Sequence, residues 1–454
     1  MPGFTLDVEK ASREATDFLR RLLQFDTTNP PGNETACARY IAEVFEKDGI
    51  PAEVVEPMPG RGSVVARLPA TKAGGAKRPL LLLSHLDVVP AAAADWKRPP
   101  FSGDLADGEI WGRGALDTKN LTALWMVVML EAKRQRAPLT RDLVFAATAD
   151  EEMGGTWGVA WLVQNRPELV DCEFALNEGG GAGIALGART AYVYQTAEKG
   201  ICWTTVTAHG KAGHASLPTK DNPVVHLAGA LHKIGTTSLP MHITDTFRLF
   251  VERLGPALPS GLSEAAGLLL DGATLESALA FFPDEYVANT IRAMTRNTAS
   301  PTVVSGSDKT NVIPQTATAQ VDCRILPGQT PESLFAELRA LLGLGQDDGG
   351  SPRLELTLAR SSLATESPPN TELSAALGKA LSRHDPDAVL VPFLVPGGTD
   401  GRFLRSQGVV CYGFCPTLSK EDYGSVHGIN ERITVASLEF GLKVLWDALA
   451  EMAF

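Results

Sequence analysis

The stretch Leu80-Leu81-Leu82-Leu83-Ser84-His85-Leu86-Asp87 places two polar side chains directly after an apolar run that is typical of a buried strand. A second apolar run, residues 143–147, leads in the same way into Asp150-Glu151-Glu152. Carboxylates and a histidine at the ends of buried strands are costly to remove from water unless something pairs with them. Two divalent cations are the simplest such partner, so the sequence predicts a two-metal hydrolase.

The spacing within these blocks suggests a division of roles. His85 and Asp87 face the same side of an extended chain, so one can bind a metal while the other orients the imidazole. A core histidine capped by an aspartate is the alternative interpretation of that pair. Glu151 and Glu152 point in opposite directions if extended, which leaves one of them free to act as a general base. Asp117 immediately precedes a predicted helix over residues 118–134, and active-site groups of open sheets lie in such turns.

Composition indicates an ordinary soluble enzyme. The 454 residues are too many for one compact core and predict two domains. A formal charge of −12 argues against nucleic acid or an anionic membrane surface as a partner. The six cysteines are scattered, which is typical of buried reduced thiols. No signal peptide or membrane-spanning segment is visible, so we expect a cytoplasmic protein.

Alternating strand and helix patterns predict an α/β fold in which helices flank a mixed, mostly parallel sheet. Helices are expected over 8–23, 34–48 and 436–449. From about residue 199 the order becomes β-α-β-β-α-β, as in a ferredoxin-like domain. We therefore predict three segments, which are a first catalytic part (1–197), a lid or dimerisation domain (198–360, with a helical insertion at about 237–298) and a second catalytic part (361–454).

Four blocks in this order resemble the co-catalytic zinc superfamily of aminoacylases, acetylornithine deacetylase, succinyl-diaminopimelate desuccinylase, glutamate carboxypeptidase and carboxypeptidase S. The resemblance runs from Asp26 to about residue 435 and implies a zinc-exopeptidase-like catalytic domain. The blocks are Ser84-His85-Leu86-Asp87-Val88-Val89-Pro90, Trp111-Gly112-Arg113-Gly114-Ala115-Leu116-Asp117-Thr118-Lys119, Asp150-Glu151-Glu152-Met153-Gly154-Gly155 and Asn177-Glu178-Gly179-Gly180.

Carried over to this chain, the resemblance implies two Zn²⁺ ions, although Co²⁺ or Mn²⁺ would also suit the ligands. His85 and Glu178 would hold one ion, Glu152 and His427 the other, and Asp117 would bridge them. Many members have aspartate where Glu178 stands, whereas the carboxypeptidase S branch has glutamate. His427 lies too far away in the sequence for local patterns to identify it.

The resemblance also assigns roles beside the metals. Glu151 would be the general base, and Asp87 would be the partner of His85. Family structures further imply a cis peptide bond between Asp117 and Thr118.

The second domain resembles the family's lid. His214 would polarise the scissile carbonyl, often from the opposite subunit of a dimer, and His209 is its local competitor. Arg324 would bind the substrate carboxylate, although it could equally pair with Asp322. Asn311 and the glycine-rich loop with Gly398 and Thr399 are the remaining predicted substrate contacts.

The predicted function is hydrolysis of the amide bond of an N-acyl amino acid, or of a short peptide with a free C-terminus, by metal-activated water. A dipeptidase or carboxypeptidase would use the same residues, and a catalytically inactive ligand-binding homologue is a more remote alternative. The partner is a small-molecule substrate, and a homodimer through the lid is possible. Within the insertion, an apolar set either lines an acyl pocket or forms the core of added helices. The set comprises Phe247, Leu249, Phe250, Val251 and Leu254.

Overall fold

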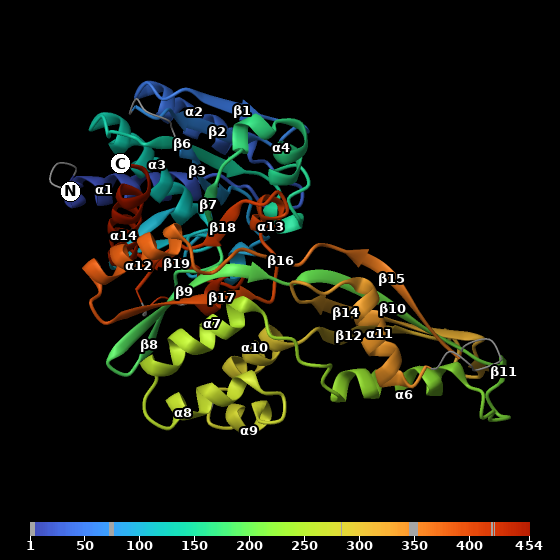
Figure 1. The fold of residues 1–454 in the computed structure, drawn as a ribbon. Coiled ribbons are helices and arrows are strands. Elements are labelled where there is room, and N and C mark those ends of the chain that lie inside the picture. The colour runs from blue at the N-terminus through green and yellow to red at the C-terminus, as the bar shows by residue number, and fades with distance from the viewer. Residues whose placement is uncertain (1–4, 72–76, 283, 345–352, 419–420, 422) are drawn as a thin grey trace.

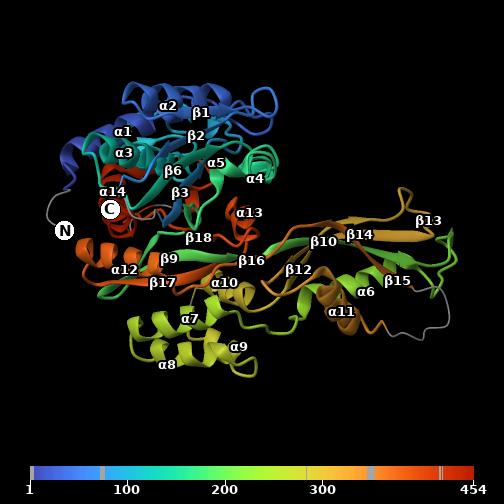
Figure 2. The ribbon, with the colours of Figure 1, turned by 45° about the horizontal axis from the view of Figure 1, so that its top comes forward.

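A computed structural model describes residues 5–71, 77–282, 284–344, 353–418, 421 and 423–454. The chain forms a large α/β body with a long arm that projects from one side (Figure 1, Figure 2). The body is built on a ten-stranded mixed sheet and the arm on a separate four-stranded antiparallel sheet. The predicted fold class is therefore confirmed.

The centre of the large sheet is parallel, because β6, β3, β7 and β18 run in one direction as neighbours. Parallel strands bring their carboxyl ends to the same edge, which is where the predicted metal ligands follow. The path of the sheet is β1 (Ala52–Val55), β2 (Ser63–Leu68), β6 (Arg141–Thr148), β3 (Lys77–His85), β7 (Phe174–Asn177), β18 (Val410–Gly413), β9 (Arg189–Glu198) and β16 (Thr365–Glu366), with β8 (Gly183–Leu186) and β17 (Ala388–Val395) also paired to β9.

Helices cover both faces of this sheet, which explains the continuous apolar run in β3. Leu80 and Leu82 face a cluster formed with α1, α2, α3 and α14, whereas Leu81 and Leu83 face a cluster formed with α4 and α13. The helices are α1 (Val8–Leu23), α2 (Thr35–Lys47), α3 (Lys119–Arg134), α4 (Val159–Asn165), α5 (Pro167–Val170), α12 (Glu372–His384), α13 (Gly401–Arg405) and α14 (Val435–Ala453). A small sheet of β4 (Asp104–Ala106), β5 (Glu109–Trp111) and β19 (Arg432–Thr434) lies beside them.

The arm has the predicted β-α-β-β-α-β order. Its sheet runs β12 (Thr298–Ser305), β14 (Thr316–Ile325), β10 (Gly200–His209) and β15 (Leu354–Ser361). Helices α6 (Pro223–Thr236) and α11 (Pro331–Leu342) pack on one face through a shared apolar cluster. At the outer end, β11 (Gly213–His214; Figure 1) pairs with β13 (Val312–Ile313; Figure 2).

The insertion is helical, as predicted, and its apolar core packs on the body, while His242 also contacts Glu337 of the arm at 2.6 Å. Phe247, Phe250 and Val251 are buried against Val391 and Leu394 of β17. The interpretation as helix core is therefore correct for the members of the set other than Leu249, and none of the set lines the cleft described below, which argues against the acyl pocket. The helices are α7 (Asp245–Leu254), α8 (Leu262–Gly267), α9 (Leu275–Leu279) and α10 (Glu285–Thr295).

The cysteines and the helix lengths can also be compared with the sequence-based expectations. All six cysteines are buried free thiols, as the scattered spacing predicted. Within the described residues, every helix is too short or too polar to cross a bilayer.

Candidate active site

The predicted metal ligands gather at the carboxyl edge of the parallel strands. His85 is the last residue of β3, and Glu178 directly follows β7. Glu152 lies in a short 3-10 turn that follows β6, and Asp117 lies just before α3. His427 comes from a loop near the C-terminus, where it adopts a left-handed φ of 58°. The structure thus brings together five residues that are widely separated in the chain.

Asp117 stands between the two histidines. Its Oδ1 lies 3.1 Å from Nε2 of His85, and its Oδ2 lies 3.0 Å from Nε2 of His427. Glu178 Oε2 is 3.2 Å from the same nitrogen of His85, and Glu152 is 3.2 Å from the same nitrogen of His427. Each oxygen of Asp117 therefore faces one pair, consisting of a histidine and a glutamate.

The charges in this cluster depend strongly on one another. Burial and the charge of Glu178 raise the pKa of Glu151 well above its ordinary value. Burial, partly offset by His85, raises the pKa of Glu178 to about 8. Hydrogen bonds with Asp117 and Glu152 raise the pKa of His427 to about 10. Burial thus disfavours the charged forms of Glu151 and Glu178, so these carboxylates ionise more readily when positive charge lies beside them.

The donor set fits two divalent cations. The ligand atoms of His85, Asp117 and Glu152 lie within 4.8 Å of one another, as do those of His85, Glu151 and Glu178. Imidazole nitrogens and carboxylate oxygens suit zinc, cobalt and manganese. A carboxylate that offers one oxygen to each of two histidine–glutamate pairs is the arrangement that a bridged metal pair requires.

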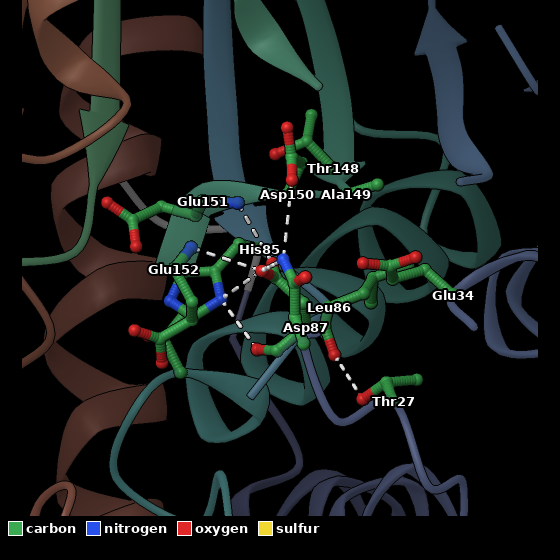
Figure 3. Close-up of polar contacts among 12 residues, drawn as sticks. Thr27, Glu34, His85, Leu86, Asp87, Thr148, Ala149, Asp150, Glu151 and Glu152 are labelled. Atoms are coloured by element: carbon green, nitrogen blue, oxygen red, sulfur yellow. Dashed lines mark hydrogen bonds and ion pairs between the residues drawn. The ribbon is translucent and has the colours of Figure 1, made fainter. Parts of the chain in front are cut away.

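Asp87 lies behind the metal centre and contacts more than His85. Nδ1 of His85 lies 2.9 Å from the backbone oxygen of Asp87 and 3.5 Å from its carboxylate. The carboxylate also accepts hydrogen bonds from the backbone N–H groups of Glu151 and Glu152, both at 3.0 Å (Figure 3). Asp87 therefore orients the histidine and holds the turn that carries Glu151.

A buried ion cluster supports this turn from the other side, and sequence analysis missed it. Arg61 contacts Glu34 at 2.9 Å and forms a short ion pair with Asp150, the residue before Glu151. Asp150 has a left-handed φ of 74° and also accepts a hydrogen bond from Asn29. Local patterns give no signal for such contacts, because the partners lie between 27 and 121 residues apart in the sequence.

Glu431 is a second residue whose role the sequence did not reveal. Its fully buried carboxylate accepts hydrogen bonds from the backbone N–H groups of Gly114, Leu116 and Asp117 and pairs with Arg113 at 2.7 Å. It therefore fixes the backbone that leads into Asp117. The peptide bond between Asp117 and Thr118 is cis, as the resemblance implied.

A cleft of about 760 Å³ opens onto the centre between body and arm. Arg324 and the loop at Gly398 and Thr399 line it. Arg324 forms a two-pronged ion pair with Asp322, at 2.6 and 3.0 Å, so the alternative partner foreseen for it is present. The N–H and hydroxyl of Thr399 both donate to buried Glu198, which leaves neither of them free for a substrate.

His214 and Asn311 lie elsewhere. Both are exposed at the outer end of the arm, where the backbone oxygen of Asn311 accepts from the N–H of Ala215. His209, the competitor, is half-buried and lies 3.4 Å from Glu355. None of these side chains lines the cleft of its own chain.

Comparison with known proteins agrees with this geometry. Residues 81–451 match the Peptidase family M20/M25/M40. The chain is 29% identical to human N-fatty-acyl-amino acid synthase/hydrolase PM20D1, over 98% of this chain and 88% of that protein. It is 28% identical to human aminoacylase-1, over 87% of this chain and 85% of that protein.

Solved structures share the fold. An M20 family metallo-carboxypeptidase from Sulfolobus solfataricus superposes with a TM-score of 0.64 at 19% identity, over 96% of this chain and 98% of that chain. A tripeptidase from Staphylococcus aureus gives a TM-score of 0.66 at 17% identity, over 97% of this chain and 99% of that chain. Since the family match spans most of the sequence and includes all five residues of the cluster, from His85 to His427, this chain belongs to the M20/M25/M40 family of metallohydrolases.

Proposed function

We propose that this protein is a two-zinc amidohydrolase that cleaves N-acyl amino acids or short peptides with a free C-terminal carboxylate. The observation that carries the proposal is the position of Asp117, with one carboxylate oxygen toward each histidine–glutamate pair. His85 and Glu178 would hold one zinc, Glu152 and His427 the other, and Asp117 would bridge them. When bound, the metal pair would acidify water and polarise the scissile carbonyl.

Glu151 performs the proton transfers in this proposal. Its carboxylate faces the centre within reach of the ligand atoms of His85 and Glu178. It removes a proton from the attacking water and then delivers that proton to the leaving nitrogen of the amide. Asp87 and the Arg61–Asp150 pair hold the backbone of the turn, so the carboxylate stays in position during both transfers.

The cleft supports a substrate that carries a carboxylate beside its amide bond. Arg324 and Gly398 lie along its wall, together with the apolar side chains of Ile201 and Trp203. The relatives named above include both acyl-amino acid hydrolases and peptidases. We favour the acylase because the two curated relatives described above, which align over most of this chain, are named for acyl-amino acid chemistry. A dipeptidase or carboxypeptidase is the second candidate.

A homodimer through the arm completes the proposal. His214 and Asn311 lie next to each other at the outer end of the arm, where they could reach a partner's cleft but not their own. Exposed valines on β12 and α6 offer apolar side chains that a second copy could cover. They are Val224, Val225, Val303 and Val304, which are 43–64% exposed.

The test is hydrolysis of a panel by metal-stripped protein reloaded with zinc, cobalt or manganese. Acetyl, long-chain acyl and aromatic acyl amino acids would be compared with dipeptides and tripeptides, and Glu151→Ala would serve as the control. Metal-dependent turnover that the mutant lacks supports the mechanism, and the preferred compound separates acylase from peptidase. A folded protein that hydrolyses no compound with any metal would favour the ligand-binding alternative.

A further inference from the structure

Two arginines from different parts of the fold meet beside the metal centre. Arg360 is near the end of β15 in the arm, and Arg402 is in α13 of the body. Both line the cleft next to Gly154. A methyl group on Gly154 would lie 3.3 Å from Nη2 of Arg360 and 3.9 Å from Nη2 of Arg402, so these nitrogens are no farther apart than the sum of those distances.

Neither guanidinium has an acidic partner among the residues that the structure describes. Arg360 is exposed and stacks on Trp203, with its central carbon 5.3 Å from the ring. Arg402 stacks on Phe403 and donates to the backbone oxygens of Thr399 and Gly154, both at 2.8 Å. Two like charges this close repel each other, and an anion between them would relieve the repulsion.

Arg324 and Lys199 are further basic side chains that line the cleft. Arg324 is paired with Asp322, and Lys199 donates to the backbone oxygens of Ala293 and Arg296. Asp400, close to Arg402, forms no ion pair with it, and burial raises the pKa of this carboxyl to about 7. Among the described residues, Arg360 and Arg402 are therefore the two guanidinium groups lining the cleft that have no carboxylate partner.

This pair is separate from Arg324. In the arm sheet, Arg324 lies opposite Ile201 on one side of β10, whereas Arg360 lies opposite Trp203 on the other side. Neighbouring strands are about 5 Å apart, so the two arginine backbones are about 10 Å apart or more. Arg324 is also held by Asp322, whereas Arg360 has no carboxylate partner among the described residues. The apolar strip of Ile201 and Trp203 lies between them.

We propose that Arg360 and Arg402 form a second anion subsite, which takes a carboxylate additional to the one beside the scissile amide. The inference rests on the proposed hydrolase function and refines its substrate class to dianions. The extra carboxylate would come from an acidic amino-acid side chain or from a dicarboxylic acyl group. Bound there, it would receive charge-assisted hydrogen bonds from both the arm and the body.

The test compares matched ligands that differ in this charge. N-acetylglutamate is paired with N-acetylglutamine, and N-succinylleucine with N-butanoylleucine. The first pair tests a carboxylate on the amino-acid side chain, and the second pair tests one on the acyl group. Binding is measured by calorimetry on metal-loaded Glu151→Ala protein, which prevents turnover. We expect at least one dianion to bind about tenfold more tightly than its neutral counterpart.

Arg360→Gln in the same background should remove that preference, because this side chain has few structural contacts to lose. Arg339→Gln is the matched control, since Arg339 is also exposed and also stacks on an aromatic ring, that of Phe335, outside the cleft. Equal affinities within both pairs, no binding of either dianion, or an equal effect of the control would overturn the proposal.

The same ligands separate this inference from the hydrolase proposal. If protein with Glu151 intact hydrolyses the neutral compounds but binding shows no charge preference, the subsite is wrong and the hydrolase stands. If it hydrolyses none of the four compounds while Arg360 still governs dianion binding, the subsite stands and the hydrolase proposal fails.

Discussion

Glu431 shows how one buried side chain can position a metal ligand by holding its backbone and not its carboxylate. It holds three backbone N–H groups between Gly114 and Asp117. We expect Glu431→Gln to weaken metal binding about 10–100-fold, because the amide cannot accept all these bonds and the bridging carboxylate loses its fixed backbone. Metal affinity would be measured by competition with a chelator.

The control for that measurement is Glu439→Gln. Glu439 pairs with Lys443 on the surface of α14, and its side chain is 40% exposed. The Glu439→Gln protein should bind metal with the same affinity as the unmodified protein. A Glu431→Gln protein with unchanged affinity would contradict the role assigned to Glu431.

Glu34 makes stability depend on pH. Burial and the charge of Asp87, partly offset by Arg61, raise the pKa of Glu34 from 4.5 to about 7. Between these values the folded protein binds more protons than the unfolded chain, so the free energy of unfolding falls as pH rises. The loss across this window is on the order of 3 kcal/mol.

Glu34→Gln lacks this titrating group. The melting temperature of the unmodified protein should therefore fall, relative to that of Glu34→Gln, between pH 5 and pH 7.5. Glu9→Gln on the exposed face of α1 is the control and should leave the pH dependence unchanged. A constant difference between the two melting curves would show that Glu34 does not bind its proton more tightly in the folded state.

At the level of elements, local pattern predicted most of the fold. The helix at Val8–Leu23 begins and ends where the hydrophobic periodicity placed it, and the helices expected over 34–48 and 436–449 are present as Thr35–Lys47 and Val435–Ala453. Periodicity reports which face of an element is buried, but not against what. For that reason the sequence predicted the insertion's helices and could not predict that they pack on β9 and β17.

The candidate site was predictable to the same extent. His85, Asp117 and the Glu151–Glu152 pair were visible because each follows or precedes a regular element. Arg61 and Glu431 were not, because their partners are distant in the sequence and their residue types are common on surfaces. His427 entered only through resemblance to a family.

Because the insertion does not line the cleft, we expect changes in its core to lower stability without changing substrate preference. Phe247 is fully buried between α7 and β17, so Phe247→Ala should lower the free energy of unfolding by about 3–5 kcal/mol. The order of preference among acyl substrates should stay the same, because Phe247 does not line the cleft. Trp203→Ala, which alters the cleft wall, should instead change KM for those substrates. A changed acyl preference in Phe247→Ala would restore the acyl-pocket interpretation.

At the scale of the whole molecule, the proposed dimer has a consequence that mixing two inactive variants can test. His214→Ala lacks the arm histidine, and Glu151→Ala lacks the general base. If each site uses the partner's histidine, a mixed dimer regains one intact site from two defective chains. With equal amounts and free exchange, half of the dimers are mixed, so about a quarter of the sites should be active. The activity should appear only after subunits exchange, which native mass spectrometry with one variant isotopically labelled would follow, and neither variant alone should gain activity on the same treatment. A mixture that stays inactive while forming mixed dimers would mean that His214 serves no partner site. Activity retained by His214→Ala alone would remove the histidine from the mechanism altogether.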